Sequence, residues 1–192
     1  QWMDEVGAWH VRYNRASGWH NEGEYRKCAE DLSVATASDP TVQQKIHALA
    51  YRCLIAAKDL SGANAQVQIL GGVTRVEAKQ AIAHGWLLME RHRAADVPTF
   101  LAPLDTKTLK PSEKKGVYAL HIAALVSSGD VERALAIATG KEARTEYNLA
   151  VLLYNAGRYE EAESVLKRAC PHAVPDFQSE CAKFIEIVQN AE

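Results

Sequence analysis

Apolar residues recur every three or four positions along most of the chain, and short polar or glycine-containing segments separate these runs. Near the C-terminal end, Leu149, Leu152 and Leu153 belong to one such run, and a second run begins at Tyr159. This spacing places the apolar side chains on one face of an α-helix. Gly157 lies between the two runs, where a glycine ends a helix in the left-handed conformation at little steric cost. The pattern therefore predicts a helical hairpin.

The same pattern occurs near the start of the chain. Residues 13–16 are Tyr-Asn-Arg-Ala, and Gly23 follows seven residues after that alanine; residues 147–150 are Tyr-Asn-Leu-Ala, and Gly157 follows at the same distance. A tyrosine stands two residues after each glycine. Small residues then recur at equal offsets in the two copies, as Cys28 and Ala35 in the first and Ala162 and Ala169 in the last. Internal repetition of this kind indicates an array of similar helical hairpins.

These residues resemble the tetratricopeptide repeat family, whose unit is a helix-turn-helix of about 34 residues. The resemblance is clearest over residues 8–40 and 143–174. It implies an all-α fold of stacked antiparallel hairpins, a right-handed α-solenoid of about five hairpins with a capping helix over 175–190. We expect residues 1–192 to form one such domain. The resemblance also implies a concave groove that binds a peptide or helix of a protein partner.

The segments between the two clear copies follow the pattern less closely. Thr74 is expected to cap one helix, with Glu77 completing a capping box, and Ser112 to cap another. Pro98 is tolerated only in the first turn of its helix. Gly140 ends the fourth hairpin early, which departs from the usual repeat length. The helices expected here cover residues 41–57, 61–70, 74–92, 94–101, 117–127 and 131–138.

Composition and charge narrow the possible partners. Hydrophobic residues make up 47% of the chain, and 22 basic against 24 acidic side chains give a formal charge of -2. Because no strong field of one sign follows from this balance, nucleic acid is not expected as the main partner. No run of 18 apolar residues occurs, so direct membrane insertion is not expected either. A protein partner within a multiprotein complex is the expectation that remains.

Motifs for catalysis, metals or cofactors are not found. No two of the seven histidines have the i,i+4 spacing of a helical metal pair, so we predict no metal site and place the histidines on helix surfaces or in the groove. No nucleophile elbow, phosphate loop or dinucleotide fingerprint occurs, so no catalytic residues and no cofactor are predicted. An enzyme is therefore not expected. The histidines are His10, His20, His47, His84, His92, His121 and His172.

The four cysteines allow two interpretations. Cys28, Cys53, Cys170 and Cys181 contain no C-x-x-C motif, and they can serve as small apolar helix residues with free thiols. Alternatively they form two local disulfides, Cys28 with Cys53 and Cys170 with Cys181. We favour the free thiols and with them a cytoplasmic protein, whereas paired cysteines favour a secreted or periplasmic one. Four cysteines allow three pairings, and the sequence does not choose between them.

The expected partner-binding surface is the groove lined by the first helix of each hairpin. Aromatic residues and arginine on that face suit an interface, although Trp86 and Tyr147 can instead pack between helices. The predicted groove residues are His10, Tyr13, Asn14, Ser17, His20, Asn21, Arg52, Trp86, Met89, Arg144, Tyr147, Asn148, Val151, Tyr154 and Asn155.

Two functions fit this surface. The first is a scaffold that binds a peptide or helix of a partner in the groove. The second is a structural subunit held permanently in a larger assembly through its convex face and ends. An exposed apolar patch outside the groove would favour the second function. A closed pocket of titratable groups would favour a third and more distant one, a small hydrolase.

Overall fold

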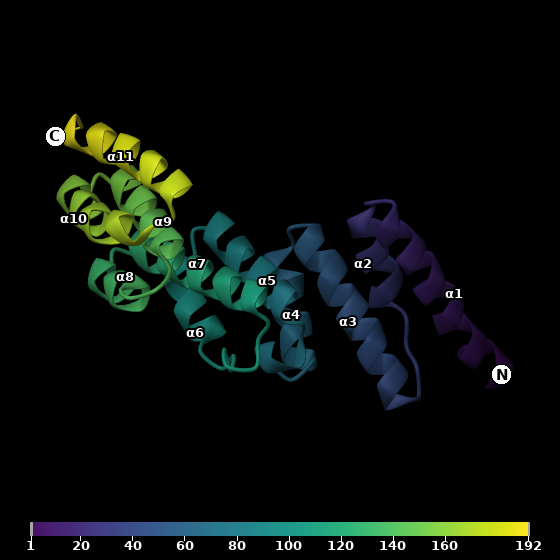
Figure 1. Cartoon of the computed structure of the whole chain (residues 1–192). Helices are drawn as coiled ribbons and strands as arrows, with labels where there is room; N and C mark the ends of the chain where they lie inside the picture. Colours follow the sequence, from purple (N-terminus) through teal and green to yellow (C-terminus); the bar gives the residue numbers. More distant parts are fainter. Residues whose placement is uncertain (1, 192) are drawn as a thin grey trace. The chain divides into compact units, whose positions relative to one another are not determined.

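The computed structural model describes residues 2–191 and the side chains of residues 9–191. Within this range the chain has eleven α-helices, three short 3-10 helices and no strand (Figure 1). The predicted all-α fold class is confirmed for these residues. The helices are α1 (Trp2–Asn21), α2 (Tyr25–Ser33), α3 (Pro40–Ala56), α4 (Leu60–Ile69), α5 (Ala78–Glu90), α6 (Val97–Leu101), α7 (Pro111–Ser127), α8 (Val131–Ala138), α9 (Ala143–Asn155), α10 (Tyr159–Ala169) and α11 (Pro175–Gln189). The 3-10 helices are η1 (Val73–Arg75), η2 (Ala94–Asp96) and η3 (Cys170–His172).

The chain divides into two compact units. Unit 1 comprises Gln1–His92 and Phe100–Lys107, and unit 2 comprises Arg93–Thr99 and Thr108–Glu192. The sequence predicts a single repeat domain over 1–192, whereas each of these units has apolar clusters of its own.

Unit 1 is built from two helical hairpins and a fifth helix. Helix α1 pairs with α2 and α3 pairs with α4, while α2 packs against α3, and α5 packs against α3 and α4. One apolar cluster lies among α1, α2 and α3, and a second lies between α3 and α4. The buried residues of the first include Ala16, Cys28, Leu32, Ile46 and Leu49, and those of the second are Tyr51, Ala63, Val67 and Leu70.

Unit 2 contains the hairpins α7–α8 and α9–α10, and α11 packs beside α10. Its core includes Ile122, Val131, Leu149, Leu153, Val165, Leu166 and Val188. Glu146 in the first turn of α9 is buried, and its carboxylate accepts hydrogen bonds from the backbone N–H of Gly140 at 2.9 Å and from Nε of Arg168 at 3.0 Å. This side chain therefore links α9 to α10 and to the loop after α8.

The turn that closes each hairpin has the same backbone form. In four hairpins, the residue after the left-handed one donates its N–H to the carbonyl five residues earlier, at 2.8–2.9 Å. This arrangement satisfies carbonyl groups at the end of the first helix. Glycine takes the left-handed position in three of these turns and Lys58 takes it in the fourth; His92 has the same backbone conformation after α5. The left-handed residues are Gly23, Lys58, His92, Gly129 and Gly157.

A buried small or β-branched residue follows each of these turns at the same distance. Five residues after the left-handed position, the second helix of each of these four hairpins carries a side chain that is completely buried, and the residue at the same distance after His92 is completely buried as well. These residues are Cys28, Ala63, Val97, Ala134 and Ala162. Small side chains here allow the two helices of a hairpin to approach closely, so the repetition seen at both ends of the sequence extends to the hairpins between them.

Three local predictions were wrong. Helix α5 begins at Ala78 rather than near Thr74, because residues 73–75 form η1 and bury Val73. It ends at Glu90, and η2 takes up the first three of the eight residues of the expected partner helix over 94–101. Helix α7 begins with Pro111 at its first position, so Lys110 rather than Ser112 is the N-cap residue, and the side chain of Glu113 accepts the Lys110 backbone N–H at 3.0 Å.

Candidate functional site

The first helices of unit 1 share one repeated surface position. Ser17, Arg52 and Trp86 each lie six residues before the left-handed residue of their hairpin, so they occupy corresponding faces of α1, α3 and α5. Helix α3 contacts both α1 and α5. The three helices therefore place this predicted groove position on neighbouring elements within unit 1.

At this position, Arg52 has a donor atom without a hydrogen-bond partner among the described residues, and Trp86 has an exposed apolar ring. The Nε atom of Arg52 is buried and has no hydrogen-bond partner among the described residues. Trp86 keeps 42% of its surface exposed although it is large and apolar, and Met89, one turn later on α5, is half-buried. A guanidinium Nε without an acceptor among the described residues, on a helix that packs against the one carrying an exposed indole, resembles the centre of an interface more than the surface of an isolated domain.

The α1 residues of the predicted groove are partly engaged within the hairpin. The ring of Tyr13 lies edge-on to Trp9 with centroids 6.5 Å apart, and Ser17 donates its hydroxyl to the Tyr13 carbonyl at 2.9 Å. The ring of His20 lies edge-on to Tyr25 at 5.6 Å. His10, Asn14 and Asn21 are exposed. The last three side chains are thus the most accessible part of the α1 face.

His84 contradicts the prediction that the histidines lie on surfaces or in the groove. It is completely buried on α5, where the Tyr51 hydroxyl donates to its Nδ1 at 2.9 Å and its Nε2 donates to Oδ1 of Asn64 at 3.0 Å. Because Tyr51 is also buried, desolvation raises the pKa of its hydroxyl. These hydrogen bonds satisfy polar groups where α3, α4 and α5 meet, and a single histidine in an apolar stretch carries no sequence signal for such a contact.

In unit 2, α11 contacts part of the predicted groove. The ring of Tyr147 on α9 packs against Phe177 at 4.9 Å and against Phe184 at 5.5 Å, and Tyr154 packs against Phe184 at 5.5 Å. Burial raises the pKa of Tyr147, and the neighbouring Glu180 raises it further. Tyr147 therefore packs between helices, which is the alternative to its expected place on the groove surface.

The other predicted residues of α9 differ in their surroundings. Arg144 pairs with Glu180 of α11 at 3.2 Å, and its guanidinium carbon lies 4.7 Å from the ring centre of Phe177. Val151 is half-buried, while Asn148 and Asn155 are exposed. The α11 partners of these residues were absent from the predicted groove, although two phenylalanines seven residues apart on one helix face were a usable signal.

A shallow hollow lies between α9 and α11. Its volume is about 390 Å³, and it has an apolar floor and a charged rim. Ile187 on its edge is 50% exposed. The lining residues are Tyr147, Asp176, Ser179, Glu180, Lys183, Phe184 and Ile187. The hollow is open and most of its lining is apolar, so it suits an apolar side chain of a protein better than a small substrate.

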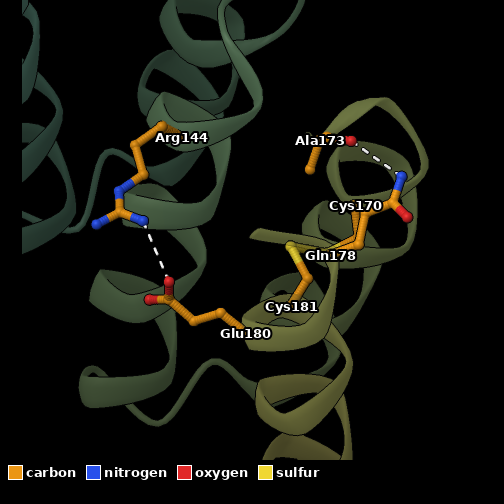
Figure 2. The surroundings of a disulfide bond; sticks show 6 residues. All are labelled: Arg144, Cys170, Ala173, Gln178, Glu180 and Cys181. Atoms are coloured by element: carbon orange, nitrogen blue, oxygen red, sulfur yellow. Dashed lines mark hydrogen bonds and ion pairs between the residues drawn. A yellow bond between two sulfur atoms is a disulfide. The ribbon is translucent and has the colours of Figure 1, made fainter. Parts of the chain in front are cut away.

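Two disulfides join neighbouring elements. Cys28 of α2 is bonded to Cys53 of α3 with Cα atoms 6.0 Å apart, and Cys170 of η3 is bonded to Cys181 of α11 with Cα atoms 5.7 Å apart. Figure 2 shows the second bond together with the Arg144–Glu180 ion pair, which attaches the adjacent residue of α11 to α9. The four cysteines are therefore paired in the structure, as the second of the two interpretations predicts, and the favoured free thiols are not found.

We compared the chain with protein-family models, curated proteins and solved structures. No family model, no curated protein and no solved structure matches the chain. Across the part of the chain that the structure describes, no cluster of three or more histidine, cysteine, aspartate or glutamate residues could hold a metal ion. None of the helices in the same part is both long and apolar enough to cross a membrane.

Proposed function

We propose that this chain is a protein-interaction scaffold of the tetratricopeptide kind and that it acts by binding rather than by catalysis. Two features support the proposal: the recurring left-handed turns and the buried residue five positions after each of them. Hairpins related in this way stack with their first helices on one side, and stacked arrays offer that side to peptides or helices of partners.

The face of α1, α3 and α5 in unit 1 is the proposed binding site. The observation that carries it is Arg52, whose buried Nε has no hydrogen-bond partner in the part of the chain that the structure describes, at the same repeat position as the exposed Trp86. The guanidinium of an arginine offers several donors to a carboxylate or carbonyl of a partner, and an exposed indole supplies a large apolar contact. These are the residue types that dominate the binding energy of protein interfaces.

We further propose that the chain works in an oxidising compartment, such as the exterior of a cell or a bacterial periplasm. The two disulfides support this setting, because reducing agents of the cytoplasm keep most thiols free.

A second candidate function is that of a structural subunit in a permanent assembly. Val34 and Ile69 favour it, because they end the second helices of the first two hairpins at equal distances from Gly23 and Lys58 and are 57% and 58% exposed. Two large apolar side chains repeated outside the first-helix face suit a convex contact surface.

Two double variants separate these functions. Arg52→Ala/Trp86→Ala alters the first-helix face, and Val34→Ser/Ile69→Ser alters the second helices at positions that are also exposed. Each tagged variant is used to purify partners from the native source with isotope-based quantification, after circular dichroism has verified its helix content. Scaffold binding predicts at least a tenfold loss of the main partner with the first variant and retention with the second. The reverse result favours the structural subunit, and retention by both variants excludes both surfaces.

A further inference from the structure

Helix α11 contacts α9 through a simple side-chain pattern. Phe177 and Phe184 lie seven residues apart, on one face of α11, and both rings contact Tyr147. Phe184 also contacts Tyr154, one heptad further along α9. A pair of aromatic residues on each helix, each pair separated by one heptad, is a helix-to-helix contact of the kind used between separate proteins.

Charge fixes the orientation of this contact. Glu180 lies one turn after Phe177 and pairs with Arg144 at 3.2 Å, and Arg144 lies one turn before Tyr147 on α9. At the other end of α11, the Gln189 amide donates to the carboxylate of Glu163 on α10. A helix that replaced α11 would need an acidic residue at the place of Glu180, because Arg144 would otherwise lose its only carboxylate partner among the described residues.

The Cys170–Cys181 disulfide holds α11 in this position. It closes a short loop, with a sequence separation of 11, between the end of the α9–α10 hairpin and the middle of α11. Cys170, the first residue of η3, keeps 9% of its surface exposed, whereas Cys28, Cys53 and Cys181 are completely buried. Of the two disulfides, only Cys170–Cys181 therefore includes a residue with any exposed surface, so a reductant reaches it before the Cys28–Cys53 bond.

We propose that the α9 face carrying Arg144, Tyr147 and Tyr154 is a docking site for an amphipathic helix of a partner protein, and that α11 occupies it until a dithiol reduces Cys170–Cys181. The partner helix carries two aromatic residues seven positions apart and an acidic residue three positions after the first, as α11 does. This site lies in unit 2 and does not rest on the proposed binding face of unit 1.

The reduction step is ordinary thiol–disulfide exchange. A thiolate of the dithiol attacks Sγ of Cys170, forms a mixed disulfide and releases the Cys181 thiolate, which takes up a proton. The second thiol of the reductant then closes its own disulfide and releases Cys170 as a thiol. Two electrons pass from the dithiol to the protein. Opening a loop of this length raises the population of undocked α11 about a hundredfold, by the loss of the loop-closure restraint.

Hydrogen exchange tests the release of α11 in the unmodified chain. After treatment with dithiothreitol, the backbone amides of α11 should exchange about a hundredfold faster, while those of α7 and α8 keep their rates. The variant Cys28→Ala/Cys53→Ala, whose remaining disulfide is Cys170–Cys181, should show the same acceleration on reduction. Unchanged exchange in α11, with alkylation showing Cys170 and Cys181 to be reduced, would overturn the proposal.

Disulfide trapping tests the docking site. The probe is a synthetic peptide of residues 174–190, which retains Cys181, and the chain carries Cys181→Ser with Phe177→Ala and Phe184→Ala to weaken its own α11. In a glutathione buffer, the peptide should form a disulfide with Cys170 at least ten times more than a matched peptide carrying Phe177→Ala and Phe184→Ala. Equal trapping of the two peptides would refute the docking site.

Two further arms keep the result interpretable. Arg144→Glu in the chain should reduce trapping of the native peptide, and Glu180→Arg in the peptide should restore it, which a loss of folding would not allow. A chain with Cys181→Ser alone keeps its aromatic residues and its fold, and it should rank the two peptides in the same order at lower yield, because its own α11 competes at high effective concentration. A reversed or absent ranking in this chain also counts against the proposal.

Discussion

Removal of the Cys28–Cys53 disulfide is expected to destabilise unit 1 by about 3.5 kcal/mol at 25 °C. The bond has a sequence separation of 25, and the loop-closure entropy lost from the unfolded chain grows with the logarithm of that length. The same relation assigns about 2.8 kcal/mol to Cys170–Cys181, with its separation of 11. The longer loop therefore stabilises its unit more, although both bonds join adjacent elements.

Tryptophan fluorescence makes this prediction specific to one unit. The four tryptophans of the chain are at positions 2, 9, 19 and 86, all within unit 1. Urea unfolding of Cys28→Ala/Cys53→Ala, followed by fluorescence, should therefore give a free energy of unfolding about 3.5 kcal/mol below that of the oxidised native chain.

The matched control is Cys170→Ala/Cys181→Ala, which removes the disulfide of unit 2. It should leave the fluorescence transition, which reports unit 1, unchanged. In circular dichroism, which reports the helices of both units, it should shift only the transition of unit 2. The reasoning would be refuted if the first variant lost less than about 1 kcal/mol, since a restraint on the unfolded chain of this length is worth several times more. It would also be refuted if the control variant shifted the fluorescence midpoint equally, because the two units would then unfold together.

Three further changes test the turns, the hairpin packing and an ion pair. Gly157→Ala should destabilise unit 2 by about 1 kcal/mol in thermal unfolding, because Gly157 has a φ of 73° and alanine is strained there. Lys58 has a φ of 59°, so Lys58→Gly removes such strain and should be neutral or stabilise unit 1 by up to about 1 kcal/mol. Ala162→Leu should lower the stability of unit 2 by about 1–3 kcal/mol in urea unfolding, because Ala162 is completely buried. The hydrogen bond from Arg15 lowers the pKa of Asp31. The ionised Asp31 carboxylate therefore stabilises the fold above pH about 4, and this stabilisation is lost as pH falls through the lowered pKa. Asp31→Asn should flatten the decline of the melting temperature, followed by fluorescence, on the acid side.

The helices and most of their ends follow from local sequence. Apolar spacing of three or four residues and the glycines at 23, 129 and 157 predict hairpins whose turns the structure contains. The helix starts near Thr74 and Ser112 were predicted wrongly, because a buried Val73 and a proline at position 111 determine the boundaries there. A capping motif in sequence is a local preference, and tertiary burial or a proline overrides it.

Long-range contacts were decided by tertiary structure. The four cysteines allowed three pairings, and the positions of α2 against α3 and of η3 against α11 select one of them. The burial of His84 depends on Tyr51 and Asn64, which lie on two other helices. Since a helix pattern states which face of a helix is apolar, but not which element covers it, neither contact could be read from spacing alone.

Some features of the candidate site also follow from the sequence, and others depend on tertiary packing. The sequence by itself placed Arg52 and Trp86 on the first-helix face of their hairpins, whereas their common distance from the left-handed residues Lys58 and His92 is known only from the structure. The repeat pattern and the resemblance also placed Arg144, Tyr147 and Tyr154 on the first helix of the last hairpin, which is α9. That α11 contacts these three side chains is a property of the packed unit, since aromatic residues on a terminal helix bury themselves against whichever apolar face the fold brings within reach.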